Sequence, residues 1–141
     1  MITISLCMIV KNEEQVLSRC LDSLVGLMDE IIIVDTGSCD RTREIAARYT
    51  DKIYDYIWKD DFADARNFAF SKASMEYIYT ADADEVLDNE NREQFRLLKE
   101  AMVPEVEIVQ MKYVTKNEFN TVLNFKAVSY THLRAHETDQ Y

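Results

Sequence analysis

The sequence contains very little glycine and proline, and it has far fewer basic than acidic residues. Of its 141 residues only two are Gly and one is Pro. Two glycines cannot supply the G-x-G-x-x-G loop of a classical dinucleotide-binding domain, which excludes that class. The 16 basic and 26 acidic side chains give a formal net charge of -10. A surface of that sign repels nucleic acid and anionic membrane, so neither is expected as a partner.

Long hydrophobic runs and paired cysteines are also missing. No segment approaches the roughly 20 apolar residues that a membrane span needs, and the N-terminus "MITISLCMIVKNEE" lacks the basic region of a signal peptide. The three cysteines, at positions 7, 20 and 39, form an odd set without metal-type spacing. Reduced thiols in a soluble, cytoplasmic protein are therefore expected.

What the sequence does have is an alternation of apolar runs and amphipathic segments. Its hydrophobic fraction of 48% is typical of a packed globular domain. The predicted strands are 2–10, 30–35, 52–58, 77–81 and 106–114. Four helices are predicted between them. The first begins after Asn12, which would be its N-cap with Gln15 completing a capping box, and the others cover Asp40 to about Tyr49, 62–74 and 91–102. The third helix is expected to bury Phe62, Ala65, Ala69 and Ala73.

This order predicts an α/β fold with a mostly parallel sheet covered by helices on both faces. In such sheets ligands bind at the carboxyl ends of the strands. The loops after Val10, Val34, Trp58 and Ala81 are therefore expected to converge. These loops supply the polar candidates Asn12, Glu13, Asp35, Ser38, Arg66, Asp82 and Asp84.

The run "YIYTADADE" ends the fourth strand with clustered acids. Residues two apart on an extended chain point to the same face, so Asp82 and Asp84 are expected to present their carboxylates together. Two such groups repel one another unless a cation lies near them, and hard oxygen ligands suit Mg²⁺ or Mn²⁺. The other interpretation is a solvated acidic turn in which Asp88 and Glu90 simply cap the next helix.

Four blocks together resemble glycosyltransferase family 2, nucleotide-sugar enzymes of the GT-A fold. They are "MIVKNEE", "EIIIVDTGSCDRT", "DDFADARNFAFSKA" and "YIYTADADE", in the family's order over roughly residues 3 to 90. The resemblance implies a Rossmann-like three-layer sandwich that transfers a sugar from a nucleoside diphosphate, classically UDP, with inversion. It also implies an acceptor, which can be a glycan, a peptide or a protein, and a Mn²⁺ or Mg²⁺ cofactor.

The resemblance also implies roles for five residues. Glu13 would lie near the nucleoside, Asp35 would contact the base, and Arg66 would approach the nucleotide. The alternative for Asp35 is a side chain that forms a turn before Gly37, and the alternative for Arg66 is a surface ion pair with Asp61 or Asp64. Asp82 would lie near the ribose and help hold the metal, which Asp84 would bind directly. The sequence departs from the family pattern at Thr36, where an acidic or amide residue is common, and at Ile9, where a proline is common.

The family's catalytic base lies well downstream of the D-x-D motif, and no residue is assigned to it. The tail 128–141, "VSYTHLRAHETDQY", resembles translated sequencing adapter. We therefore expect an incomplete nucleotide-sugar-binding domain over 1–127 and a non-native tail, whose two histidines belong to no site. The alternative interpretation is a fragment that holds a nucleotide without catalysing transfer.

A different enzyme class can also be considered for the acidic motif. "DADEV" fits the nucleophile motif of haloacid dehalogenase-like phosphatases, with Asp82 as nucleophile. Those enzymes normally carry the motif on an early strand, whereas here it follows the fourth.

Overall fold

A computed structural model describes residues 1–101, 108–114 and 122–130 of the chain. Within them, strands and helices alternate up to the last two strands. In chain order the elements are β1 (Ile4–Val10), α1 (Leu17–Leu24), β2 (Glu30–Asp35), α2 (Thr42–Ala46), β3 (Ile53–Asp55), α3 (Phe62–Ser71), β4 (Tyr77–Thr80), α4 (Asn89–Ala101), β5 (Ile108–Val114) and β6 (Val122–Tyr130). Among the described residues, no helix combines the length and hydropathy needed to cross a bilayer.

The strands form one sheet in the order β3-β2-β1-β4-β6-β5. β3, β2, β1 and β4 are all parallel, whereas β6 is antiparallel to both β4 and β5. Parallel strands need crossover connections, and the three helices α1, α2 and α3 provide them. The predicted α/β fold with a mostly parallel sheet is confirmed.

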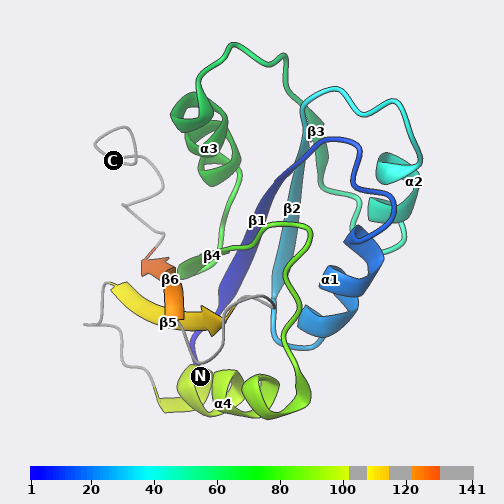
Figure 1. The fold of residues 1–141 in the computed structure, drawn as a ribbon. Helices are drawn as coiled ribbons and strands as arrows, with labels where there is room; N and C mark the ends of the chain where they lie inside the picture. Colours follow the sequence, from blue (N-terminus) through cyan, green and yellow to red (C-terminus); the bar gives the residue numbers. More distant parts are fainter. Residues whose placement is uncertain (102–107, 115–121, 131–141) are drawn as a thin grey trace.

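Helices cover both faces of the sheet, which gives three layers (Figure 1). α1 and α2 lie on one side and α3 on the other. Along β1 the even residues, such as Leu6 and Met8, face the core that includes Leu17 and Leu21 of α1. Cys7, which points the opposite way, belongs to the second core with Phe70 of α3. Two buried faces explain why the strand reads as a continuous apolar run rather than an alternating one.

The amino ends of the strands are joined by a buried carboxylate. Glu30 begins β2 and is 6% exposed. It accepts hydrogen bonds from the Ser5 hydroxyl (2.6 Å) and from the Ser74 backbone N–H and hydroxyl (both 2.8 Å), and it pairs with the Lys52 ammonium. Burial alone would raise the pKa of this carboxyl, but these bonds lower it to about 2. Three strands and the loop before β4 are therefore tied together at this edge.

Several helices and strands are shorter than predicted. β3 covers only Ile53–Asp55 of the predicted 52–58, and α2 ends at Ala46 rather than near Tyr49. Phe62, which was expected inside, is 51% exposed because it is the first residue of α3 and lies beyond the sheet. Ala65 and Ala69 of the same helix are buried as predicted.

The predicted cap of the first helix is wrong. α1 begins at Leu17, and no side chain caps its N-terminus. Asn12 instead has a positive φ of 54° and lies in the loop before the helix. Asparagine tolerates this left-handed conformation, and its side chain bonds another loop, so it is not available as a cap.

The fifth predicted strand, 106–114, corresponds to β5, and its first two residues lie outside the described ones. β6 was not predicted. It extends from Val122 to Tyr130, so it crosses the predicted boundary at 127 and pairs Tyr130 with Tyr77 of β4. Residues 131–141 of the predicted tail, with both histidines, lie outside the described residues. The division at 127 stays a prediction.

Candidate functional site at the carboxyl ends of the strands

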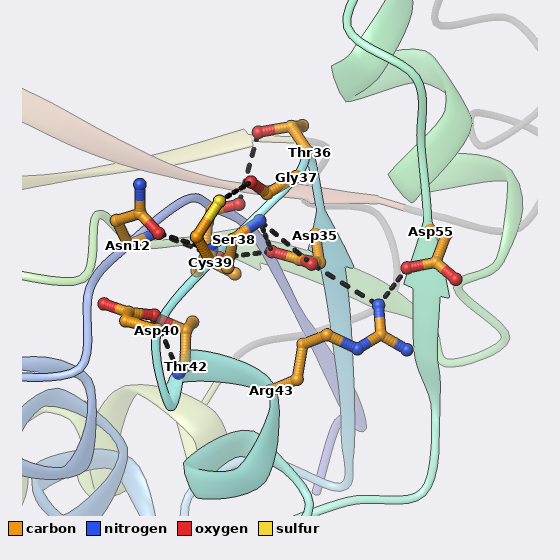
Figure 2. A network of polar contacts seen from close by, with 11 residues as sticks. Asn12, Asp35, Thr36, Gly37, Ser38, Cys39, Asp40, Thr42, Arg43 and Asp55 are labelled. Atoms are coloured by element: carbon orange, nitrogen blue, oxygen red, sulfur yellow. Dashed lines mark hydrogen bonds and ion pairs between the residues drawn. The ribbon is translucent and has the colours of Figure 1, made fainter.

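The loops that follow β1 and β2 are bonded side by side (Figure 2). The Asn12 backbone N–H donates to the Ser38 hydroxyl (2.9 Å), and the Asn12 amide oxygen accepts from the Cys39 N–H (2.7 Å). The Glu13 N–H donates to the Thr42 hydroxyl at 2.7 Å. These bonds fix the backbone of Glu13 relative to the end of β2, as the predicted convergence of the two loops requires.

Asp35, the last residue of β2, is buried, with 3% of its surface exposed. Its carboxylate accepts from the Ser38 hydroxyl and from the Ser38 backbone N–H at 3.2 and 3.3 Å. The Arg43 guanidinium lies 3.4 Å from Asp35 Oδ2 and also pairs with Asp55 at the end of β3 (Figure 2). The predicted turn at Gly37, with a φ of 116°, allows Ser38 to reach back to Asp35.

The acidic motif after β4 is a turn, which corrects the predicted extended segment. The Glu85 N–H donates to the Asp82 carbonyl (3.0 Å), and the Glu85 side chain accepts from the Asp82 N–H. Ala81 and Ala83 are buried, whereas Asp82 and Asp84 are exposed. The small alanines anchor the turn, and the two residues that carry the carboxylates are exposed. That both carboxylates point to the same face stays a prediction.

Helix α1 holds this turn through two side chains that the sequence analysis did not assign to the site. The Arg19 guanidinium donates to the Asp84 carbonyl at 3.5 Å, and the Cys20 thiol donates to the Asp82 carbonyl at 3.6 Å. Both bonds use backbone carbonyls of the turn. Side chains of α1 thus position the acidic turn.

Glu13 experiences the negative charge of this edge. Burial raises the pKa of its carboxyl above the ordinary value, and the carboxylates of Asp84, Asp82 and Asp40 raise it further. Like charges brought this close destabilise one another unless a cation offsets them. The structure therefore brings together Glu13, Asp82 and Asp84 out of the five predicted site residues.

The donor set suits a hard divalent cation that takes additional ligands from elsewhere. Across the residues that the structure describes, no three His, Cys, Asp or Glu side chains are grouped to hold a metal by themselves. Mg²⁺ and Mn²⁺ sites commonly use one or two carboxylates, with waters and substrate phosphates completing the coordination. The exposed carboxylates of Asp82 and Asp84 fit this second arrangement.

Arg66 is not bonded to the acidic group. Its guanidinium lies over the ring of Phe62, 5.1 Å from the ring centroid, on the outer part of α3. Within the described part of the chain it forms no ion pair, so the predicted alternative of a surface pair with Asp61 or Asp64 is not observed. Its cation remains available toward the loop after β3.

Arg43 is the residue near the predicted site that the sequence analysis missed. It lies in the first turns of α2, eight positions after Asp35. In a parallel α/β sheet, a helix starts near the carboxyl end of the strand that precedes it, so a basic residue there is near that strand's last carboxylate. The acidic ends of β2 and β3, with "DRTRE" (40–44) between these strands in the chain, were a usable signal.

A family model described as "Glycosyl transferase family 2" matches residues 5–138. Several curated relatives also match the chain. A TPR repeat-containing protein of Synechococcus elongatus is 47% identical over 62% of the chain and 22% of its own length. Glycosyltransferase SunS of Bacillus subtilis is 38% identical over 64% of the chain and 22% of its length. The lipopolysaccharide core biosynthesis glycosyltransferase LpsC of Rhizobium meliloti is 36% identical over 75% of the chain and 39% of its length. The chain thus spans well under half of each relative.

Solved structures share the fold. S. aureus TarS (residues 1–349) superposes on 99% of this chain and 50% of its own, with a TM-score of 0.72 at 19% identity. Glucosyl-3-phosphoglycerate synthase from Mycobacterium tuberculosis, solved with Mn²⁺ and UDP-glucose, covers 60% of this chain and 34% of its own, with a TM-score of 0.51 at 26% identity. The GT-A arrangement is therefore confirmed for the described sheet.

Proposed function

The chain belongs to glycosyltransferase family 2, and we propose that it binds a UDP-sugar and a divalent metal at the carboxyl ends of β1, β2 and β4. The observation that carries this proposal is that the loops after β1 and β2 are bonded together at the same edge as the exposed Asp82 and Asp84, whose charges raise the pKa of the Glu13 carboxyl beyond the effect of burial. A cation and a polar ligand at this edge would relieve that repulsion.

We assign the predicted roles as follows. Asp35 accepts a hydrogen bond from the base, and Glu13 lies near the nucleoside. Asp82 lies near the ribose, and Arg66 approaches the nucleotide from α3. The buried, multiply bonded carboxylate of Asp35 supports a recognition role, because its position is fixed before any ligand arrives.

Asp84, assisted by Asp82, would hold Mg²⁺ or Mn²⁺. When bound, the metal would supply Lewis acidity that stabilises the departing diphosphate. The protein's own part is to hold both carboxylates outward on a turn fixed by Arg19 and Cys20. The M. tuberculosis synthase of the same fold was solved with Mn²⁺ and UDP-glucose, which supports this choice of ligands.

The reaction proposed for the whole protein is transfer of the sugar to an acceptor with inversion, which requires a carboxylate base to deprotonate the acceptor. None of the described residues is assigned as that base. The named relatives act in different settings, so the acceptor is proposed only as a glycan, peptide or protein. A cytoplasmic location is also proposed, supported by thiols at buried Cys7 and exposed Cys39.

The phosphatase interpretation of Asp82 has no observation in its favour. The acidic turn follows β4, the fourth strand in the chain, and the chain matches glycosyltransferase family 2 over residues 5–138. A phosphatase nucleophile would be expected after an early strand.

The proposal is tested by calorimetric titration of UDP into the purified chain with and without Mn²⁺. We expect binding that depends on Mn²⁺ and that weakens at least tenfold in Asp84→Asn, because the amide keeps the size of the side chain but removes the charge. Asp51→Asn is the matched control. Asp51 is an exposed carboxylate just before β3, at the opposite end of the strands, and its loss should leave the affinity within twofold.

Circular dichroism of each variant shows whether the chain is folded. Absence of UDP binding in a folded wild-type chain would refute the donor site. UDP binding that is equal with and without Mn²⁺, and unchanged in Asp84→Asn, would refute the metal assignment. The proposed nucleotide binding would still stand. Binding without any transfer to acceptors would identify this chain as the nucleotide-binding part alone.

A further inference from the structure

We propose that Arg43 is a positioning residue that holds the Asp35 carboxylate for base recognition and thereby contributes to selection of the base. This inference rests on the proposed function, since it takes Asp35 as the group that contacts the base. It concerns a residue of α2 that touches neither the metal ligands nor the acidic turn in any described contact.

The sheet register creates the need for this arginine. β2 and β3 are parallel, and Asp35 is the direct partner of Asp55. Like charges directly opposite one another on neighbouring strands destabilise a sheet. Arg43 reaches from α2 and pairs with both carboxylates through the same nitrogen (Figure 2). One cation thus offsets two anions at the place where both strands end.

The contacts also fix the orientation of Asp35. Oδ1 accepts from the Ser38 hydroxyl, and Oδ2 faces the Arg43 guanidinium at 3.4 Å. The Ser38 N–H lies 3.2 and 3.3 Å from the two oxygens. Donors on both oxygens hold the plane of the carboxylate. Removing Arg43 would leave Ser38 as the holder of a buried anion.

An ionised carboxylate can only accept hydrogen bonds. At the position where uracil presents an N–H, cytosine presents an unprotonated nitrogen, which would face the carboxylate lone pairs. A carboxylate held in the correct orientation therefore favours uracil over cytosine. If Arg43 maintains that orientation, its removal should reduce the affinity for UDP more than the affinity for CDP.

The experiment measures dissociation constants of UDP and CDP in saturating Mn²⁺ for the full chain and its variants. In Arg43→Met we expect about tenfold weaker UDP binding and a smaller UDP to CDP preference. Arg43→Lys should restore part of both, because an ammonium replaces the charge but not the planar fork. Arg41→Met is the matched control, since Arg41 is 75% exposed and pairs only with Glu44 in the described contacts. Its binding should stay within twofold.

Asp35→Asn separates this inference from the function on which it rests. Unchanged UDP binding in Asp35→Asn would refute the base contact itself. A loss in Asp35→Asn without a loss in folded Arg43→Met would refute only the role of Arg43. An equal loss of UDP and CDP in Arg43→Met would show a merely structural role and also refute the proposal. If Arg43→Met does not fold, the UDP to CDP ratio in Arg43→Lys decides, and a ratio equal to the wild-type value refutes it.

Discussion

At the amino ends of the parallel strands a buried carboxylate meets a cation and several hydrogen-bond donors, whereas at the carboxyl ends Glu13 has several carboxylates as neighbours. Glu30 has a lowered pKa, because its bonds outweigh the effect of burial. Glu13 has a raised one, because burial and neighbouring carboxylates act in the same direction. The first arrangement stabilises the fold, and the second leaves negative charge for a ligand to neutralise.

A second bond at the amino edge strengthens this contrast. Lys99 of α4 is 6% exposed, and its ammonium donates to the Leu27 carbonyl (2.9 Å) and pairs with Asp29 at 2.6 Å. Asp29 in turn accepts from the Ile4 N–H at 2.9 Å. Buried charges at this edge are thus paired, as buried charges must be.

The largest effect is expected from removing the carboxylate at the amino edge. Glu30→Ala should lower the free energy of unfolding by about 3 kcal/mol, because it leaves the Ser5 hydroxyl and the Ser74 N–H without their acceptor and Lys52 without its partner. Urea unfolding at pH 7 measures this change.

Glu44→Ala serves as the control, because Glu44 is 61% exposed and pairs only with Arg41 in the described contacts. This substitution should lower the free energy of unfolding by less than about 0.5 kcal/mol. UDP binding by folded Glu30→Ala should stay within threefold of wild type. A large loss of binding in the folded variant would contradict the separation between the two edges.

The same carboxylate predicts an acid dependence of stability. Its pKa is about 2 in the folded chain against an ordinary value of 4.5, so its contribution is complete above about pH 4.5 and is lost as pH falls toward 2. The shift corresponds to about 3 kcal/mol. The difference in unfolding free energy between wild type and Glu30→Gln should therefore shrink steadily over this interval. A difference that stays constant from pH 7 to pH 2 would show that the charge of Glu30 is not what stabilises the edge.

The sequence predicted what depends on local pattern. Runs of β-branched residues such as 30–35 marked the buried parallel strands, and the stripe of Leu17, Cys20 and Leu21 marked the inner face of α1. The alternation of these elements then placed the loops after β1 and β2 at one edge, where their hydrogen bonds are found.

What the sequence did not predict depends on contacts between distant segments. The pairing of Arg43 with both Asp35 and Asp55 requires the register of β2 with β3, which no periodicity reveals. The Asn12 amide oxygen accepts a hydrogen bond from the Cys39 N–H of another loop, so it does not cap the helix that follows it. β6 pairs antiparallel with β4 from more than forty residues away, without a turn signal near either strand.

A smaller effect is expected at Asn12, where the two loops of the carboxyl edge are joined. Asn12→Ala loses the bond from the Cys39 N–H and places a Cβ-bearing residue without a polar side chain at a φ of 54°, so we expect a loss of about 1–2 kcal/mol. Asn12→Gly loses the same bond without the backbone strain, so its free energy of unfolding should be about 1 kcal/mol higher than that of Asn12→Ala. Thermal melting compares the two variants. Equal stabilities would mean that the left-handed backbone is not strained in the alanine variant.

The smallest expected change has the opposite sign, and it tests whether the carboxyl edge is held for a ligand at the cost of stability. Glu13 has a raised pKa in the folded chain, so its charged form destabilises the fold at neutral pH and this penalty disappears as pH falls through the folded pKa. Glu13→Gln should therefore raise the free energy of unfolding by a few tenths of a kcal/mol at pH 7 and by nothing near pH 3.

The same variant should weaken Mn²⁺-dependent UDP binding, because it removes one of the carboxylates that the ligand neutralises. Glu14→Gln, at the next position of the same loop, is the control for a change of charge alone. A Glu13→Gln chain that is both less stable and unchanged in binding would place Glu13 with the structural carboxylates such as Glu30, and the contrast between the two edges would not hold.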